Sequence, residues 1–326
     1  MTDAIVVEGL RKRFGNVDAL AGIDLAVAPG TVFGLLGPNG AGKTTAVRVL
    51  ATILRPDGGR AAVLGHDVVR EPDAVRRRIG LAGQYAAVDA NLTGRENLRM
   101  VGILGQLPKD EIAPRAAELL ERFQLADAGD RPLRTYSGGM RRRLDVAASL
   151  VNRPPVLFLD EPTTGLDLTS RNELWEMIRE LVSDGTTVLL TTQYLEEADL
   201  LASRIAVVDG GRVIANDTPA NLKANLGSTV FEIGMPSGTA PRALTLLDRR
   251  VPGRVEVEGD TLRIGSQDGP RVLMDILREL DTENLQPETL TVREPSLDDV
   301  FLALTGRHAE NFAAESAAAP GLGGGR

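Results

Sequence analysis

A glycine-rich segment of this chain has the residue types and the spacing of a loop that binds phosphate groups. It follows the apolar run Val32 to Leu36, leads into a predicted helix, and reads Gly37, Pro38, Asn39, Gly40, Ala41, Gly42, Lys43, Thr44 and Thr45. Glycines let successive backbone N–H groups and the positive end of a helix point at an anion. Lys43 would add a positive charge to the phosphate oxygens, and the Thr44 hydroxyl would hold Mg²⁺. An ordinary glycine-rich turn is the alternative.

A second candidate for chemistry is a short apolar run that ends in two carboxylates. Residues Val156 to Leu159 are followed by Asp160 and Glu161. Such a run is typical of a buried parallel strand, and ligands meet open parallel sheets at the carboxyl ends of the strands. We therefore predict that Asp160 lies beside Mg²⁺ and that Glu161 is the general base for attack by water. Without the phosphate loop, the pair would more simply indicate a turn or a helix cap.

The composition limits the chemistry and the location of the protein. There is no cysteine and there are only two histidines, so neither disulfides nor a metal site built on these residues is expected. The formal charge of −8 argues against a broad nucleic-acid surface, and no nucleic-acid partner is expected. No apolar run approaches the roughly 18 residues of a membrane span, and no secretory signal is visible. These features favour a cytosolic protein.

The elements that must position these residues alternate along the first two thirds of the chain. Residues 4–36 predict short, mainly antiparallel strands that lead into the phosphate loop. Residues 92–127 have helical periodicity throughout and predict an all-helical insertion, at about residues 90–150. Further strands are predicted at Thr187 to Thr191 and at Ile205 to Asp209. This alternation of strands and helices predicts an α/β domain over residues 4–226.

The pattern changes beyond residue 226. Strands at 230–234 and 289–293, helices at 241–247 and 270–280, and a hairpin turning at Gly259 and Asp260 give the order β-α-β-β-α-β. That order matches a split βαβ unit, so residues 227–306 predict a small α+β domain of the ferredoxin-like kind. A last helix, Leu297 to Leu304, is predicted with Ser296 as its cap. Residues 307–326 are rich in alanine and glycine and are expected to be disordered.

A third segment identifies the kind of phosphate loop. Tyr136, Ser137, Gly138, Gly139 and Met140 stand at a predicted helix start, before the acidic strand. The segment resembles the signature of ATP-binding cassette (ABC) ATPases, with Tyr for the usual Leu and Met for the usual Gln. A hydroxyl and two glycines at a helix start can form a second anion site, although a plain helix cap is the alternative. The three arginines that follow, at 141–143, are unfavourable in the first turns of a helix because their charge opposes the helix dipole. An anion nearby would offset that cost; a solvated basic face is equally consistent with these arginines.

Other cassette elements stand in the expected order along residues 4–226. Phe14 falls where these ATPases place an aromatic ring against adenine, and Gln84 falls at the loop whose amide reaches the metal and the attacking water. Gly165, Leu166 and Asp167 resemble the loop that crosses to a partner subunit. The resemblance implies a P-loop NTPase that binds ATP and Mg²⁺ and forms a homodimer on ATP binding. In such a dimer each ATP lies between the phosphate loop of one copy and the signature of the other.

One position departs from the family at large. After the strand that ends at Thr191, the chain has Gln193 where most cassettes carry a histidine. A glutamine side chain can donate a hydrogen bond to a γ-phosphate, but it cannot take up a proton near neutral pH. Gln193 is therefore a candidate catalytic residue that leaves Glu161 as the principal base. A polar residue that merely closes a strand is the alternative.

Two segments point to a subgroup. Residues 193–199 and the run Pro295 to Leu302 resemble drug-resistance ATPases of the daunorubicin-resistance (DrrA-like) type. This resemblance implies export of an antibiotic or other hydrophobic compound through a separate polytopic membrane subunit, with the ATPase peripheral on the inner face of the cell membrane. The helical insertion would dock on that subunit. A soluble ABC ATPase acting as a nucleotide switch, and a regulator that does not hydrolyse ATP, are the alternatives.

Overall fold

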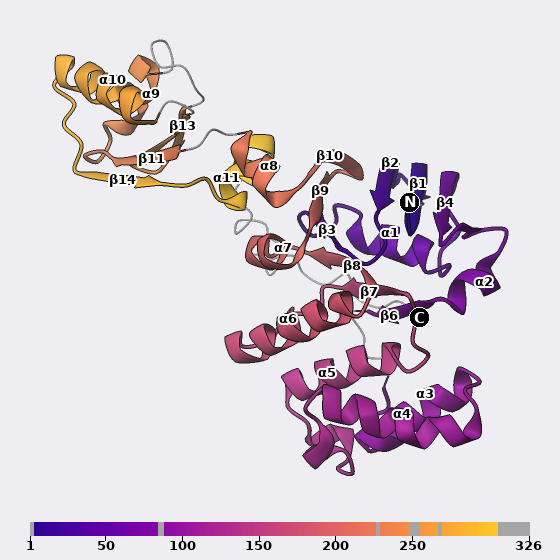
Figure 1. Ribbon diagram of the computed structural model, residues 1–326. Coiled ribbons are helices and arrows are strands. Elements are labelled where there is room, and N and C mark those ends of the chain that lie inside the picture. Colours follow the sequence, from indigo (N-terminus) through magenta and orange to yellow (C-terminus); the bar gives the residue numbers. More distant parts are fainter. Residues whose placement is uncertain (1–2, 84–87, 226–228, 248–254, 267–268, 306–326) are drawn as a thin grey trace. The chain divides into compact units, whose positions relative to one another are not determined.

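A computed structural model describes residues 3–83, 88–225, 229–247, 255–266 and 269–305 (Figure 1). The chain divides into two compact units between Asn216 and Asp217. The sequence places the domain boundary later, after residue 226. The difference is helix α8 (Pro219–Ala224), which packs against α11 (Leu297–Thr305) of the second unit.

The first unit contains a six-stranded sheet in the order β10-β9-β3-β8-β7-β6. Its strands are β3 (Val32–Leu36), β6 (Ile79–Ala82), β7 (Val156–Asp160), β8 (Thr187–Thr192), β9 (Arg204–Asp209) and β10 (Arg212–Asp217). The pairs β3 with β8, β3 with β9, β7 with β8 and β6 with β7 are parallel. Every residue of β3, β7 and β8 is buried, as the apolar runs predict for central parallel strands. The carboxyl ends of these three strands therefore meet at one edge.

A second, four-stranded sheet has the order β2-β1-β4-β5. Its strands are β1 (Ile5–Phe14), β2 (Val17–Val27), β4 (Gly58–Val63) and β5 (His66–Asp67), and the pairs β1 with β2, β1 with β4 and β4 with β5 are antiparallel. The prediction of short strands was wrong here, because β1 and β2 have 10 and 11 residues. Three register shifts between β1 and β2 interrupt the regular alternation without ending the ladder, so the pattern resembles a series of shorter strands.

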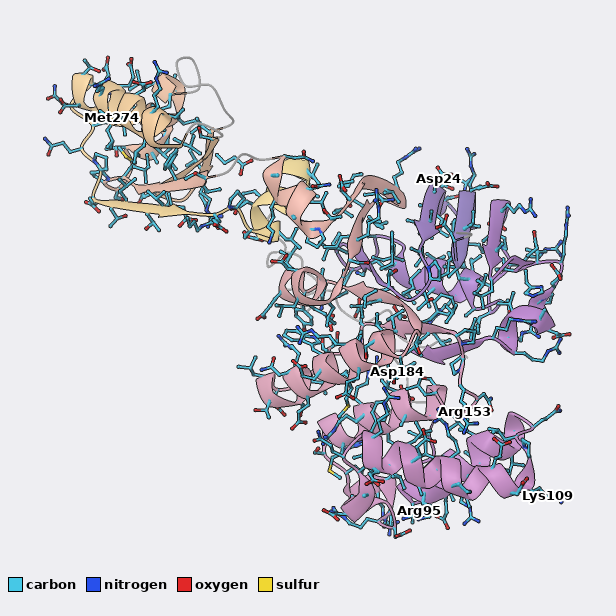
Figure 2. The ribbon with its side chains drawn as sticks, in the orientation of Figure 1. Asp24, Arg95, Lys109, Arg153, Asp184 and Met274 are labelled. Atoms are coloured by element: carbon cyan, nitrogen blue, oxygen red, sulfur yellow. The ribbon has the colours of Figure 1, made fainter. Side chains whose placement is uncertain are left out.

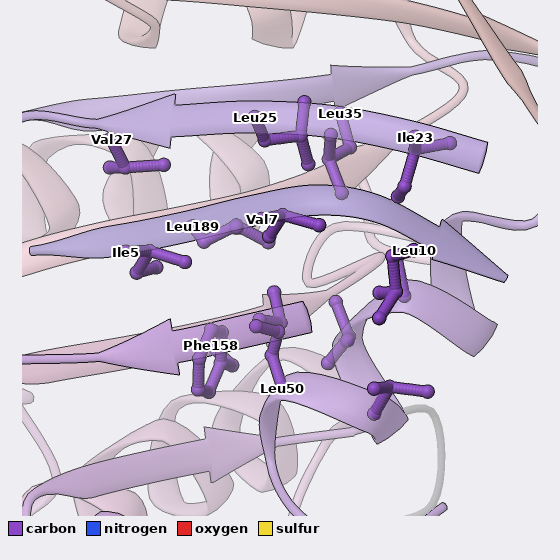
Figure 3. Close-up of a cluster of buried hydrophobic side chains, with 14 of the residues drawn as sticks. Ile5, Val7, Leu10, Ile23, Leu25, Val27, Leu35, Leu50, Phe158 and Leu189 are labelled. Carbon is purple, nitrogen blue, oxygen red and sulfur yellow. The ribbon is translucent and has the colours of Figure 1, made fainter. Parts of the chain in front are cut away.

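The two sheets of the first unit face each other across a shared core (Figure 3). Labelled side chains of this core come from β1, β2, β3, β7, β8 and α1 (Lys43–Leu50): Ile5, Val7, Leu10, Ile23, Leu25, Val27, Leu35, Phe158, Leu189 and Leu50. All of them are buried. Because α1 begins at Lys43 and packs into this core through Leu50, the core fixes the helix that ends the phosphate loop.

Helices cover the parallel sheet and form the insertion. They are α1, α2 (Pro72–Arg76), α3 (Gly94–Leu104), α4 (Lys109–Arg122), α5 (Gly138–Ser149), α6 (Leu168–Ser183) and α7 (Leu195–Leu201). The predicted helical insertion is confirmed, but it is not helical throughout: the chain turns between α3 and α4, where Gln106 has a φ of 59° and Pro108 precedes the new helix. A capping box between Thr93 and Glu96 starts α3. Arg95 and Lys109 lie at the periphery of the insertion (Figure 2).

The second unit is an α+β fold. It contains α8, β11 (Thr229–Gly234), α9 (Ala240–Leu247), β12 (Val255–Glu258), β13 (Thr261–Ser266), α10 (Gly269–Thr282), β14 (Thr289–Arg293) and α11. The antiparallel sheet has the order β12-β13-β11-β14, which is the ferredoxin-like arrangement that the element order predicts. Arg293 donates to Asp299 at 2.6 and 2.8 Å and to Glu232 at 2.8 Å, so an ion-pair network attaches α11 to the sheet. The tail predicted to be disordered lies outside the described residues.

Truncation of the shared core is expected to destabilise the first unit. Phe158 is fully buried between the two sheets, so Phe158→Ala should lower the free energy of unfolding by about 3–5 kcal/mol, measured by urea denaturation. Ile53 is 59% exposed, and Ile53→Ala should change that free energy by less than about 0.5 kcal/mol. Equal effects of the two substitutions would contradict this description of the core.

Candidate nucleotide-binding site

The phosphate loop joins β3 to α1, and two of its glycines are required by close backbone contacts. A Cβ on Gly37 would lie 2.2 Å from the carbonyl oxygen of Val208. Gly42 has a φ of 108°, and a Cβ there would lie 2.3 Å from the carbonyl oxygen of Ala19. Neither position can carry a side chain without moving a neighbouring strand, so the loop is held tightly between β9 and β2.

Lys43 is buried at the first turn of α1. Its Nζ donates to the carbonyl oxygens of Gly37 at 2.7 Å and Pro38 at 3.0 Å, and lies 3.6 Å from Oε1 of Glu161. Burial lowers the pKa of Lys43, and the carboxylates of Glu161 and Asp160 partly oppose that shift. The ammonium group is therefore held inside the loop by neutral carbonyls and one carboxylate, and an arriving phosphate would supply a stronger partner.

Asp160 connects three elements at the carboxyl edge of the parallel sheet. Its Oδ1 accepts from the Thr44 hydroxyl at 3.0 Å and from the Thr191 hydroxyl at 2.6 Å. These hydroxyls belong to α1 and β8, while Asp160 ends β7. The predicted pair of Thr44 and Asp160 is thus brought together, as neighbouring oxygen atoms of the kind that Mg²⁺ prefers. No cluster of three or more acidic, His or Cys side chains suited to a metal occurs in the described part of the chain.

Glu161 is held in an unusual backbone conformation. Its φ is 49°, in the left-handed region that non-glycine residues rarely adopt. Its N–H donates to the carbonyl oxygen of Thr191 at 3.1 Å and to the Thr191 hydroxyl at 3.0 Å. A backbone of this kind costs of order 1–3 kcal/mol and persists only where the surrounding contacts hold it. The conformation turns the Glu161 side chain toward Lys43 and away from the core.

A pocket of about 570 Å³ opens over this edge. It is lined by Ala19, Asn39, Gly40, Gly42, Lys43, Thr44, Thr45, Arg142, Glu161 and Thr164. The structure therefore places most of the predicted phosphate loop and the predicted base around one cavity. Such a cavity is large enough for a small-molecule ligand.

Arg142 was not predicted to line this pocket. It is a largely buried side chain of α5 that donates to the carbonyl oxygens of Gly83 at 2.6 Å, Pro162 at 2.8 Å and Asp160 at 3.2 Å. The interpretation of residues 141–143 as a solvated basic face is wrong for Arg142, because backbone carbonyls surround its guanidinium group. It also forms an ion pair with Asp145 at 3.0 Å, three residues on in the same helix. No local sequence signal shows that it lines the pocket, since the carbonyl oxygens that bind it come from distant segments.

The signature residues and Asp167 lie outside the pocket. Ser137 and Gly138 are exposed at the start of α5, where the Ser137 hydroxyl accepts from the Met140 N–H at 3.2 Å. Asp167 is exposed and caps α6 through the Ser170 N–H at 2.8 Å. A Cβ on Gly139 would lie 2.4 Å from the Ser170 hydroxyl oxygen, so the two helix starts are in close contact. Within one chain these residues act as helix caps and share one surface.

Phe14 and Gln193 do not line the pocket either. Phe14, at the end of β1, is 48% exposed, and the Lys12 ammonium lies 5.5 Å from its ring centre. Gln193 follows β8 and is half-buried. Gln84 lies outside the described residues. The roles predicted for these residues in binding ATP or the attacking water stay predictions.

Comparison with known proteins agrees with this geometry. A family model described as ABC transporter matches residues 20–164. A daunorubicin resistance ATP-binding protein of Streptomyces coeruleorubidus, DrrA2, is 56% identical over 97% of this chain and 99% of the relative. The chain belongs to the ABC transporter family. It is an ABC-type ATPase, and the resemblance inferred from the signature and the phosphate loop is confirmed.

Two further similarities, one to a relative and one to a solved structure, cover most of the chain. The Nod factor export ATP-binding protein I of Ralstonia nicotianae is 42% identical over 94% of this chain and 95% of the relative. The solved structure of cbiO1 of Clostridium perfringens, described as part of an ABC transporter complex, matches with a TM-score of 0.64 and 28% identity. That match covers 69% of this chain and 92% of the other, and it confirms the P-loop α/β fold of the cassette.

A methyl group at Gly42 is expected to disrupt nucleotide binding. In Gly42→Ala the new Cβ must displace the Ala19 carbonyl, and the left-handed backbone adds strain of about 1–2 kcal/mol. The affinity for ATP, measured by calorimetry, should fall at least about tenfold. Gly238→Ala is the matched control, because Gly238 has a φ of 79° but open space around it, in the second unit. An unchanged affinity in Gly42→Ala would contradict the loop geometry.

Proposed function

We propose that this chain hydrolyses ATP to drive export of an antibiotic or another hydrophobic compound through a separate polytopic membrane subunit. The observation that carries the proposal is the pocket lined by the phosphate loop and Glu161, with Asp160 hydrogen-bonded to Thr44 of that lining, in a chain similar along nearly its whole length to a daunorubicin resistance ATP-binding protein. No helix in the described ranges is both long enough and apolar enough to span a membrane. In this proposal the membrane subunit provides the route for the compound.

The proposed ATP site uses the loop residues from Gly37 to Thr45. Their N–H groups and the start of α1 would hold the phosphates, and Lys43 would exchange its carbonyl partners for phosphate oxygens. The oxygens of Thr44 and Asp160 fit Mg²⁺, with Gln84 as a further proposed ligand. When bound, Mg²⁺ neutralises developing charge on the phosphate oxygens. Phe14 is proposed to contact adenine.

Glu161 is proposed as the general base. Its carboxylate lies at the pocket, 3.6 Å from Lys43, and two hydrogen bonds from its N–H to Thr191 fix its backbone. Once Lys43 binds phosphate, Glu161 loses this partner and can accept a proton from the attacking water. General-base catalysis of this kind contributes about 10²- to 10⁴-fold. Gln193 is proposed to donate a hydrogen bond to the γ-phosphate.

A second copy of the chain is proposed to complete the site. Cassettes of this family dimerise and work with membrane subunits. Here Ser137, Gly138, Gly139 and Asp167 lie outside the pocket of their own chain, and the exposed ones among them share one surface. A homodimer that forms on ATP binding would bring this surface over the pocket of the partner. The ATPase is accordingly proposed to lie in the cytoplasm, peripheral on the inner face of the cell membrane.

Removal of the proposed base should separate binding from hydrolysis. Glu161→Gln is expected to bind ATP with affinity near that of the native protein but to hydrolyse it at least about a hundredfold more slowly. Calorimetry measures the affinity for ATP, and phosphate release measures the rate of hydrolysis. Glu111→Gln, a change on the exposed surface of the insertion, is the control and should keep both. If Glu161→Gln still hydrolyses ATP at the native rate, the general base must be another residue.

The transport proposal is tested by capture of the partner. Glu161→Gln with ATP is expected to copurify a polytopic membrane protein from detergent-solubilised native membranes, since the variant should accumulate in the ATP-bound dimer. Capture with Gly42→Ala, whose affinity for ATP should be at least about tenfold weaker, is the control. Recovery only with ribosomes or DNA, or with no partner at all, would contradict the transport proposal and favour a soluble nucleotide switch.

A further inference from the structure

A buried carboxyl group lies next to the site and has no part in the function proposed above. Glu197, on α7, has an exposed fraction of 0%. Its Oε1 accepts from the Thr163 hydroxyl at 2.9 Å and from the Trp175 indole Nε1 at 3.0 Å. Burial of a carboxyl group is costly unless it is hydrogen-bonded, so both donors contribute to its stability in this position.

The donors connect Glu197 to two segments that differ in their relation to the site. Thr163 is itself fully buried and stands two residues after Glu161, in the loop that leads to Asp167. Trp175 lies in the second turn of α6, which packs on α7. Glu197 therefore joins the loop that carries the proposed base to a helix that does not line the pocket.

The electrostatic surroundings agree with this arrangement. Burial raises the pKa of Glu197, while its hydrogen bonds to Trp175 and Thr163 and the positive charge of Arg171 oppose that shift. Oε2 of Glu197 has no hydrogen-bond partner among the described residues. The carboxyl group is therefore held through Oε1 alone, by one donor on the loop after β7 and one on α6.

Besides the Lys43 ammonium 3.6 Å from its carboxylate, the other contacts that hold Glu161 act on the backbone before the loop turns. Hydrogen bonds to Thr191 hold the Glu161 N–H, and Arg142 holds the carbonyl oxygen of Pro162. Beyond Pro162, the Thr163 hydroxyl bond to Glu197 is the next contact that fixes the loop against the body of the unit. Because the φ of Glu161 is unfavourable, a loop released at Thr163 could relax toward an ordinary backbone and carry the carboxylate away from the pocket.

We infer that Glu197 is a positioning residue for ATP hydrolysis, which holds the loop after Glu161 through the Thr163 hydroxyl and so keeps the Glu161 carboxylate at the pocket. This inference rests on the proposed role of Glu161 as the base. Glu197 does not contact the pocket itself, and its effect on the rate is transmitted through Thr163.

Two substitutions each remove one hydrogen bond to the same oxygen of Glu197. Thr163→Val keeps the shape of the side chain but loses the hydrogen-bond donor in the loop after Glu161. Trp175→Phe loses the donor on α6 and leaves the loop contact in place. We expect Thr163→Val to lower kcat of the full chain about tenfold or more, with KM for ATP changed less than about threefold. Trp175→Phe should lower the midpoint of thermal unfolding but keep kcat within about threefold.

A second pair of variants distinguishes the role of the hydrogen-bond acceptor at position 197 from the role of side-chain packing. Glu197→Gln keeps an acceptor oxygen for Thr163 and should retain kcat, whereas Glu197→Ala should lose it as Thr163→Val does. Equal kcat in Thr163→Val and the native chain, or equal losses in Thr163→Val and Trp175→Phe, would overturn the inference, as would equal losses in Glu197→Gln and Glu197→Ala.

Glu161→Gln is measured in the same series. If it keeps hydrolysis, the assignment of the base fails. If Glu161→Gln loses hydrolysis while Thr163→Val keeps it, the assignment of Glu161 as the base is retained and only the positioning role of Glu197 is contradicted.

Discussion

The site depends on one carboxylate oxygen that accepts from two hydroxyl groups. Oδ1 of Asp160 binds both Thr44, at the start of α1, and Thr191, near the end of β8. These contacts draw three chain segments, far apart in sequence, to a single edge of the parallel sheet. Thr191 in turn fixes the N–H of Glu161, so the same small cluster sets the direction of the proposed base. Pairing of β3, β7 and β8 in register makes this meeting possible.

The charges at this edge are arranged so that phosphate can replace interactions already present. Lys43 is buried against two carbonyl oxygens and one carboxylate, which stabilises its ammonium group less well than phosphate oxygens would. Arg142 is also buried, but its guanidinium group is engaged by backbone carbonyls that bracket the acidic strand. Lys43 is therefore suited to exchange partners, whereas Arg142 is suited to hold the loop ends in place.

Two exposed residues near the site, Ser137 and Asp167, cap helices of their own chain. Ser137 and Asp167 each satisfy the N–H groups of their own helix, and this role is complete within the single chain. Their exposure leaves them accessible to a second copy.

In the second unit, ion pairs hold the last helix in place. Arg293 binds both Glu232 of the sheet and Asp299 of α11.

The sequence by itself determined the elements whose signals are local. The apolar runs of β3 and β7 end where predicted, the glycine spacing indicated the phosphate loop, and the order of elements indicated the ferredoxin-like second unit. The family followed from motifs that are each contiguous. Only the tertiary structure decided the rest. Arg142 and Glu197 look like ordinary charged helix residues, because the carbonyls and hydroxyls that bind them come from segments distant in sequence. The left-handed backbone of Glu161 depends likewise on Thr191, which lies in a distant strand. The length of β1 and β2 and the turn at Gln106 and Pro108 between α3 and α4 are local features, which the hydrophobic periodicity did not show because register shifts and a turn interrupt it.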